Sequence, residues 1–253
     1  MKRVLTAAAA LPVVLALVAW APPLILTLAV TLVSVICLDE FLKFADGWDM
    51  ERPSRWILFA GAVVTFSFSL GFVWVLAALV ATFFYQTALA GVRKGLNQAG
   101  GLIICGTAGV FYTCFLAGFI LMLPRPGLIV LLSIVWVGDS VAYYGGRLIG
   151  RHPLAKIISP GKTIEGALLG GIASVAAGIV VGAELMPRSL EWWFLVSAVT
   201  ATVSQIGDLT ESAFKRSANL KDSGHLLPGH GGLLDRTDSL LFAAPVFLLL
   251  LSL

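Results

Sequence analysis

Carboxylates and cations recur at helical spacing in the stretch 204–216. Asp208, Glu211 and Lys215 stand three and then four positions apart, so they would share one face of a helix. The stretch ends an apolar segment, where a carboxylate is costly to bury and is therefore a candidate for function. The alternative interpretation is a solvated helix end with an internal ion pair.

A glycine-rich stretch, 221–238, follows and delivers two more carboxylates, Asp235 and Asp238. Glycine lets the backbone come close to a ligand and turn its amides toward an anion. Carboxylate oxygens suit Mg²⁺, which proteins bind through one or two carboxylates together with substrate phosphates. With Asp208, these residues could clamp a metal over a phosphate chain. The cations available to neutralise phosphate charge are Lys215, Arg216, Lys221 and Arg236.

A third polar stretch joins two apolar segments and contains a Gly-Lys-Thr triplet at 161–163. The triplet resembles a nucleotide P-loop, but that loop needs glycine where Lys156 stands and a preceding strand, which the sequence does not indicate. The P-loop interpretation therefore fails. What remains is a turn that leads into a helix, a natural anion site where Ser159 and Lys162 can bond phosphate oxygens. Glu165, in the first turn of that helix, suits its dipole.

Another carboxylate, Asp139, lies about two turns inside the apolar segment that precedes this turn, and Tyr143 follows one helical turn later. The cost of burying Asp139 marks it as a further functional candidate.

The elements that must position these residues are membrane helices. Of the 253 residues, 58% are hydrophobic and 12% are charged, whereas a soluble domain carries about a quarter charged residues. No basic arm or stripe suggests nucleic-acid binding. The three cysteines are isolated, and His225 and His230 have no cysteine partners, so neither a disulfide framework nor a zinc site is indicated.

We predict an all-α, polytopic transmembrane helical bundle with about nine spans. The apolar segments are 4–20, 23–38, 55–70, 72–91, 100–123, 127–148, 165–186, 191–212 and 238–253. With nine crossings, fifteen of the seventeen Lys and Arg residues fall on the side of the N-terminus and two on the other. Because basic residues are retained in the cytoplasm, the N-terminus is predicted to be cytoplasmic.

Two features of these segments have structural interpretations. The mixed-charge connection 39–55 is predicted to be a solvated cytoplasmic loop. Small residues on the segment 165–186 are predicted to form a face for close helix packing, as in membrane helix pairs: Gly166, Ala167, Gly170 and Gly171.

Together, the polar motifs resemble the signature of the phosphatidate cytidylyltransferase (CDP-diacylglycerol synthase) family. The likeness spans roughly 130–245, whereas the first half matches only as a bundle of hydrophobic helices. The residues that carry it are Asp139, Tyr143, Gly146, Arg147, Ser159, Pro160, Gly161, Lys162, Thr163, Glu165, Gly166, Ser212, Lys215, Arg216, Lys221, Asp222, Pro228, Gly229, His230, Gly231, Gly232, Asp235, Arg236 and Asp238.

The resemblance implies transfer of the cytidylyl group of CTP to phosphatidic acid, giving CDP-diacylglycerol and pyrophosphate, in phospholipid biosynthesis. It implies Mg²⁺ held by Asp208 and Asp235, aided by Asp139 and Asp238, and a monovalent cation such as K⁺. The catalytic residues that it implies are Asp208, Asp235, Lys215 and Arg236. The substrate-binding residues that it implies are Ser159, Lys162, Thr163, Glu165, Tyr143, Arg147, Arg216, Lys221, Asp222, His230, Gly231 and Gly232. The family analogy also suggests a homodimer.

The chemistry agrees with the predicted topology. A phosphate that attacks a nucleotide brings two anions together, so catalysis must consist mainly of charge neutralisation and in-line positioning. CTP comes from the cytosol and the lipid from the bilayer, which predicts an active site on the cytoplasmic face of a bacterial-type inner membrane. We assign 1–125 as scaffold helices that could face lipid or form a dimer, and 126–253 as the catalytic region.

Two other functions fit parts of the sequence. Another CTP-dependent lipid enzyme, such as a lipid kinase or a synthase of a CDP-activated isoprenoid lipid, would use similar groups. A non-enzymatic lipid transporter is a different class, but transporters show broken helices in two related halves. Here the polar motifs are confined to the second half.

Overall fold

The computed structural model describes residues 2–93, 96–226 and 231–253. It contains two compact units, each described here by itself. Unit 1 comprises Met1–Met122 and Phe214–Thr237, and unit 2 comprises Leu123–Ala213 and Asp238–Leu253. Two helices, α10 (Leu190–Ser217) and α11 (Leu234–Leu251), contribute residues to both units.

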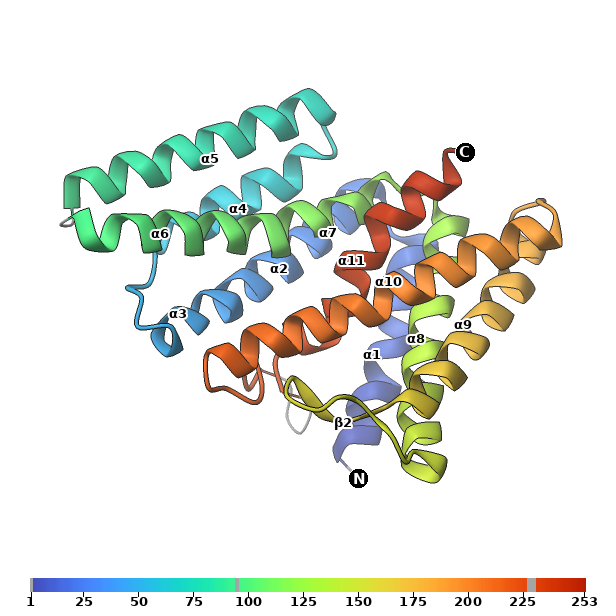
Figure 1. Ribbon diagram of the computed structural model, residues 1–253. Helices are drawn as coiled ribbons and strands as arrows, with labels where there is room; N and C mark the ends of the chain where they lie inside the picture. The colour runs from blue at the N-terminus through green and yellow to red at the C-terminus, as the bar shows by residue number, and fades with distance from the viewer. Residues whose placement is uncertain (1, 94–95, 227–230) are drawn as a thin grey trace. The chain divides into compact units, whose positions relative to one another are not determined.

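Among the described residues of unit 1, the regular elements are helices, joined by irregular stretches such as 48–55 and 218–226 (Figure 1). Its elements besides the ends of α10 and α11 are α1 (Lys2–Trp20), α2 (Pro23–Leu42), α3 (Phe44–Gly47), α4 (Trp56–Ser67), α5 (Phe72–Arg93), α6 (Leu96–Gly109), the π-helical turn η1 (Val110–Phe115), α7 (Leu116–Gly118) and the 3₁₀ turn η2 (Phe119–Met122). Proline at the first position starts α2, where a missing N–H costs nothing.

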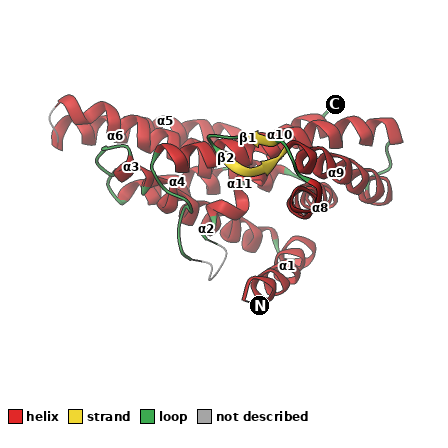
Figure 2. Ribbon diagram, turned by 60° about the horizontal axis from the view of Figure 1, so that its bottom comes forward, coloured by secondary structure: helices red, strands yellow, loops and turns green. Residues whose placement is uncertain are grey.

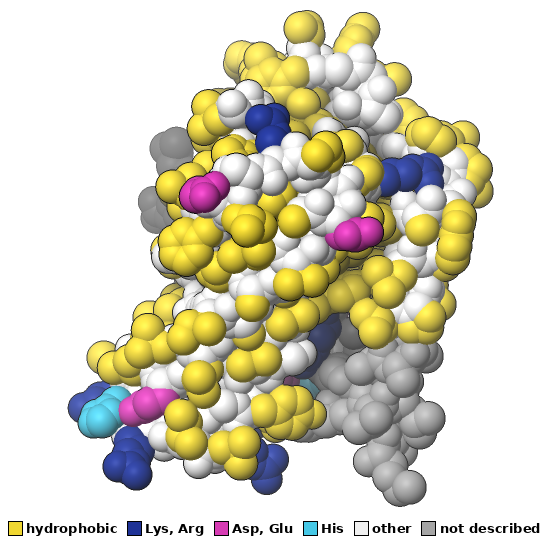
Figure 3. Space-filling view, turned by 90° about the vertical axis from the view of Figure 1, so that its right-hand side faces the viewer, with side chains coloured by type: hydrophobic (Ala, Val, Ile, Leu, Met, Phe, Trp, Pro, Cys, Tyr) yellow, Lys and Arg dark blue, Asp and Glu magenta, His cyan; other side chains and the backbone are white. Residues whose placement is uncertain are grey.

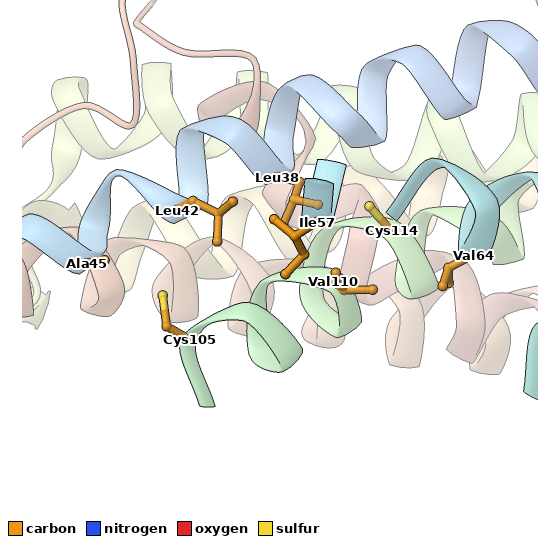
Figure 4. Packing of buried hydrophobic residues seen from close by; sticks show 8 residues of the cluster. All are labelled: Leu38, Leu42, Ala45, Ile57, Val64, Cys105, Val110 and Cys114. Atoms are coloured by element: carbon orange, nitrogen blue, oxygen red, sulfur yellow. The ribbon is translucent and has the colours of Figure 1, made fainter. Parts of the chain in front are cut away.

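The core of unit 1 forms where α2, α3, α4, α6 and η1 meet. Its buried side chains are Leu38, Leu42, Ala45, Ile57, Val64, Cys105, Val110 and Cys114 (Figure 4). The cysteines therefore serve as small packing residues. Beside them an aromatic cluster joins Phe41 to Tyr112 and to Phe214, with ring centroids 5.7 and 5.4 Å apart. These contacts attach the end of α10 to α2 within unit 1.

Unit 2 is built on α8 (Arg125–Ile149), the strands β1 (Pro153–Ala155) and β2 (Ser159–Thr163), α9 (Ile164–Leu185) and the larger parts of α10 and α11. α8 and α9 lie side by side along their length (Figure 1). The buried face of α9 repeats a small residue every fourth position: Gly166, Gly170, Ser174, Gly178 and Gly182. The predicted packing face is confirmed for Gly166 and Gly170, since a Cβ at Gly170 would lie 2.7 Å from the Cβ of Ala142. It was wrong for Ala167 and Gly171, which are only partly buried, because adjacent residues on a helix point to different sides.

Gly182→Ala is expected to destabilise unit 2 by about 1–3 kcal/mol, because the new methyl group overpacks a filled site. The added Cβ would lie 2.4 Å from the indole of Trp193, which is fully buried. Thermal unfolding of the purified protein in detergent measures the loss. The matched control on α9 is Gly171→Ala, whose Cβ would meet Gln205 Nε2 at an ordinary 3.8 Å. Equal melting temperatures for the two variants would contradict this packing.

A short antiparallel hairpin of β1 and β2 joins α8 to α9 (Figure 2). The expectation that no strand precedes the helix at 164 is therefore wrong. Strands of three and five residues with two prolines are too short to show the alternating pattern that indicates a strand. The P-loop interpretation still fails, because Gly161 and Lys162 lie within β2 rather than in a loop after it.

The chain is an all-α integral membrane protein apart from this hairpin, and each of the nine predicted segments overlaps a helix. Among the described residues, five helices are long and apolar enough to cross a bilayer: Pro23–Gly47, Phe72–Val92, Gln98–Met122, Arg125–Ile149 and Ile164–Leu185. Figure 3 shows a band of mostly hydrophobic side chains separating charged groups near the top of one face from those near the bottom. The number of nine crossings and the cytoplasmic N-terminus stay predictions.

The connection 39–55 is only in part the solvated loop that its charges predict, because 46–55 is mostly exposed whereas 40–45 is helical and mostly buried. α2 continues to Leu42, and α3 follows at once with Phe44 and Ala45 buried. Asp39 does face solvent, half exposed, and pairs with Lys43 at 2.7 Å. Its neighbour Glu40 turns inward and is only 2% exposed. The prediction was wrong for Glu40 because adjacent residues on a helix point to different sides.

Candidate functional site

The hairpin of unit 2 presents the predicted anion-binding residues next to α10. The Lys162 ammonium forms an ion pair with the Asp208 carboxylate, and both side chains are about one third exposed. Thr163 caps α9, since its Oγ1 accepts a hydrogen bond from Gly166 N at 3.1 Å. The structure thus brings together two of the predicted site residues, Lys162 and Asp208, from segments 46 positions apart.

Glu165 binds the backbone of the two residues that precede the hairpin. Its Oε2 accepts hydrogen bonds from Arg151 N at 3.1 Å and His152 N at 3.2 Å, and its Oε1 lies 2.6 Å from His152 Nδ1. Glu165 therefore holds the turn between α8 and β1 against the start of α9. Its predicted contact with substrate stays a prediction.

Four carboxylates from α8, α10 and α11 gather in unit 2. Asp238 lies within electrostatic range of Asp208, Glu211 and Asp139. Asp238 and Glu211 are buried, at 6% and 0% exposure, and Asp238 Oδ1 accepts a hydrogen bond from Ser239 N at 2.8 Å. α10 and α11 approach closely at Gly207, where a Cβ would meet the Asp238 carbonyl at 2.9 Å.

This donor set consists of carboxylate oxygens, which fits a hard cation such as Mg²⁺. Within residues 2–93, 96–226 and 231–253, no group of three or more His, Cys, Asp or Glu side chains has the arrangement of a ready-made metal cage. Mg²⁺ in nucleotide enzymes is usually held by one or two carboxylates and completed by substrate phosphates and water. The carboxylates of unit 2 therefore match the ligand type that such an ion prefers, without forming a complete cage among the described residues.

The exposed face of α8 carries the other predicted residues of unit 2. Asp139, Tyr143 and Arg147 follow one another at four-residue spacing and all three are exposed. The ring of Tyr143 meets that of Tyr144 edge to face, with centroids 5.2 Å apart. Ser159 begins β2 and is partly buried.

In unit 1 the glycine-rich stretch folds around Asp235. Asp235 Oδ1 accepts a hydrogen bond from Lys215 Nζ at 2.5 Å, and Oδ2 accepts from Ser223 N at 3.0 Å and Gly232 N at 2.7 Å. Gly231 has a positive φ of 80°, and a Cβ there would lie 2.5 Å from Asp235 Oδ2. Lys215 is nearly buried, at 9% exposure. The carboxylate thus has a fixed orientation.

The remaining predicted residues of unit 1 lie at its surface. Arg216, Lys221, Asp222 and Arg236 are exposed, and Arg216 Nη1 donates to the Leu220 carbonyl at 2.8 Å. The predicted substrate-binding residue His230 lies outside the described residues. Asp208 belongs to unit 2 and Asp235 to unit 1, so their predicted sharing of one metal ion stays a prediction.

The structure adds two residues that sequence reasoning missed, Glu40 and Ser223. Glu40 accepts a hydrogen bond from Ser223 Oγ at 2.9 Å. A carboxylate at the end of an apolar segment was the available signal for Glu40. We ended the second segment at residue 38, and this placed Glu40 in a loop. Ser223 carried no signal beyond its position in the glycine-rich stretch.

Comparison with known proteins gives a consistent result. A protein named phosphatidate cytidylyltransferase from Staphylococcus haemolyticus is 47% identical over 120 residues, covering 47% of this chain and 46% of that protein. Proteins of the same name from Haemophilus influenzae and Brucella abortus are 42% identical over 132 residues and 44% identical over 149 residues. The alignment with the Haemophilus influenzae protein covers 46% of that protein and 49% of this chain. The alignment with the Brucella abortus protein covers 55% of that protein and 56% of this chain. The aligned region thus spans about half the length of these curated relatives.

The family match is wider than these alignments. The model of the family described as "Cytidylyltransferase family" matches residues 1–253, so it includes the first half, which resembled that family only in being hydrophobic. The chain belongs to the cytidylyltransferase family.

Proposed function

We propose that this protein is a nucleotidyltransferase that transfers the cytidylyl group of CTP to phosphatidic acid, a step of phospholipid biosynthesis. A phosphate oxygen of the lipid attacks the α-phosphorus of CTP and forms a new phosphoanhydride bond. The bond from the α-phosphorus to the bridging oxygen of the β-phosphate breaks, and pyrophosphate leaves with the electron pair. The products are CDP-diacylglycerol and pyrophosphate. The family match over residues 1–253 carries this proposal.

The described residues supply groups that this reaction needs. In unit 2, Lys162 on β2 and Arg147 in the last turn of α8 are cations suited to phosphate oxygens. In unit 1, Lys215 orients the carboxylate of Asp235. Arg216, Lys221 and Arg236 are exposed cations that can neutralise the triphosphate and the lipid phosphate.

We also propose Mg²⁺ as the cofactor, with Asp208 and Asp235 as ligands aided by Asp139 and Asp238. Bound Mg²⁺ would neutralise charge on the triphosphate and polarise its oxygens. A monovalent cation such as K⁺, a homodimer, and an active site on the cytoplasmic face of an inner membrane belong to the same proposal. The charge asymmetry along the chain supports the orientation, with fifteen of seventeen basic residues on one predicted side.

The decisive assay follows the label of CTP. Purified protein in detergent micelles is incubated with phosphatidic acid, Mg²⁺ and CTP labelled at the α- or the γ-phosphorus. We expect the α-label to enter the lipid and the γ-label to enter pyrophosphate. Transfer of the γ-label to lipid would identify a kinase instead. Absence of lipid labelling from either nucleotide, with protein that stays folded, would contradict the proposed function.

Lys162→Ala is expected to raise the KM for CTP by about tenfold, because a charge-assisted contact to phosphate is lost. Steady-state rates at varied CTP measure the change. The matched control is Lys156→Ala, which removes an exposed lysine from the same hairpin connection. If the two variants and the parent protein share one KM for CTP, Lys162 does not bind the nucleotide.

A further inference from the structure

Glu40 is a buried carboxylate that reaches from α2 to the glycine-rich stretch. Its side chain is 2% exposed and lies within unit 1. Oε1 accepts a hydrogen bond from Leu233 N at 3.0 Å, and Oε2 accepts from Leu234 N at 2.8 Å and from Ser223 Oγ at 2.9 Å. A buried carboxylate is costly unless donors surround it, and here three donors do so.

Two of these donors belong to the start of α11. The first N–H groups of a helix have no partner inside the helix and need an acceptor from elsewhere. Leu233 N and Leu234 N find that acceptor in Glu40, which stands 193 and 194 positions earlier in the chain. The negative charge also suits the positive end of the helix dipole. Glu40 therefore acts as the helix cap that the local sequence does not supply.

The stretch that Glu40 binds also binds Asp235. The Ser223 hydroxyl donates a hydrogen bond to Glu40 at 2.9 Å, and the Ser223 backbone N–H donates one to Asp235 at 3.0 Å. Gly232 donates its N–H to Asp235, while a Cβ on Gly232 would lie 2.4 Å from Glu40 Oε2. A Cβ on Gly224 would lie 2.6 Å from Glu40 Oε1. The glycines thus let the backbone fit between two carboxylates.

We propose that Glu40 is a positioning residue for Asp235: by binding the Ser223 hydroxyl and the start of α11, it fixes the backbone amides of Ser223 and Gly232 that hold the Asp235 carboxylate in one orientation. The inference deepens the proposed function and rests on it, because Asp235 is there a metal ligand. Glu40 itself lies behind the stretch and acts through Ser223 and the start of α11. A neutral amide cannot replace it, because its NH₂ group would face a backbone N–H.

The structural part of the proposal is tested without any assay of activity. In Glu40→Gln, amide hydrogens in peptides that cover 231–236 are expected to exchange with deuterium about tenfold faster, because a hydrogen bond to a charged acceptor is lost. The matched control is Asp39→Asn, which makes the same chemical change on the adjacent, half-exposed residue of α2. Exchange in Glu40→Gln that equals the control would overturn the proposal.

The functional part is tested by titrating Mg²⁺ in the labelled-CTP assay. Glu40→Gln is expected to raise the Mg²⁺ concentration at half-maximal rate several-fold and to lower kcat about tenfold, with little change in the KM for CTP. A variant that merely unfolds more easily would lose active protein without moving the Mg²⁺ midpoint. Faster exchange combined with an unchanged Mg²⁺ midpoint and kcat would also overturn the proposal.

Ser223→Ala provides a second, milder variant in case Glu40→Gln does not fold. This variant removes the hydroxyl that donates to Glu40 but keeps the backbone N–H of residue 223, which donates to Asp235. We expect faster amide exchange and a higher Mg²⁺ midpoint, as in Glu40→Gln, but with smaller changes. If both the Mg²⁺ midpoint and the exchange rates equal those of the parent protein, the result contradicts the proposal. If the parent protein forms no CDP-lipid, the proposed function fails, while hydrogen exchange still decides whether Glu40 positions the stretch.

Discussion

Asp208→Asn is expected to lower the rate of CDP-diacylglycerol formation by roughly a thousandfold while the protein stays folded. Metal-dependent charge stabilisation supplies several kcal/mol, and each 1.4 kcal/mol is about tenfold in rate. A neutral amide binds Mg²⁺ weakly but keeps the size of the side chain. Asp208 is about one third exposed and pairs with Lys162, so the loss of stability should be small.

The α-labelled CTP assay measures this loss, and thermal unfolding in detergent checks the fold. Glu191→Gln is the control on the same helix, because Glu191 is exposed in the first turn of α10 and belongs to no proposed site. A rate for Asp208→Asn within about tenfold of the control, at saturating Mg²⁺, would remove Asp208 from the metal site.

Gly231→Ala is expected to reduce turnover by about a hundredfold, because it displaces the Asp235 carboxylate, and misplacement of a reacting group by an ångström can cost that much. Two physical effects combine in this variant. Its φ of 80° is unfavourable for alanine, and its Cβ would lie 2.5 Å from Asp235 Oδ2. Asp235 Oδ2 accepts hydrogen bonds from the backbone amides of Ser223 and Gly232, and it cannot move without losing these hydrogen bonds.

Gly71→Ala separates the two effects. Gly71 has a φ of 122° in unit 1, but a Cβ there would meet nothing within 4 Å. Both variants should lose about 1–3 kcal/mol of stability through backbone strain. Only Gly231→Ala should lose activity as well. Comparable turnover in the two variants would show that the position of Asp235 does not depend on Gly231.

The helices were predictable because apolar runs define them directly. Nine apolar segments each overlap a helix, and Gly166 and Gly170 lie on the buried face of α9 as expected. The hairpin was not predictable, since its strands are too short for a repeating pattern and depend on pairing between Pro153 and Thr163. The extension of α2 through Glu40 was also missed, because polar residues suggested a loop.

The candidate site was predictable to the extent that it lies in local motifs. The spacing of Asp208, Glu211 and Lys215 on one helix follows from sequence, and so does the delivery of Asp235 by a glycine-rich stretch. The ion pair of Lys162 with Asp208 joins β2 to α10, and no local pattern encodes that pairing. The contacts of Glu40 join residues more than 180 positions apart, and no local pattern encodes them.

The distance along the chain between Glu40 and its donors has a consequence for biosynthesis. A ribosome adds about 5–20 residues per second, so Leu234 is made on the order of tens of seconds after Glu40. During that interval the nascent chain has α2 but lacks the amides that Glu40 accepts. The cap of α11 can form only after Leu233 and Leu234 have been synthesised, so the ordering of Asp235 must follow the synthesis of α2 by at least that interval.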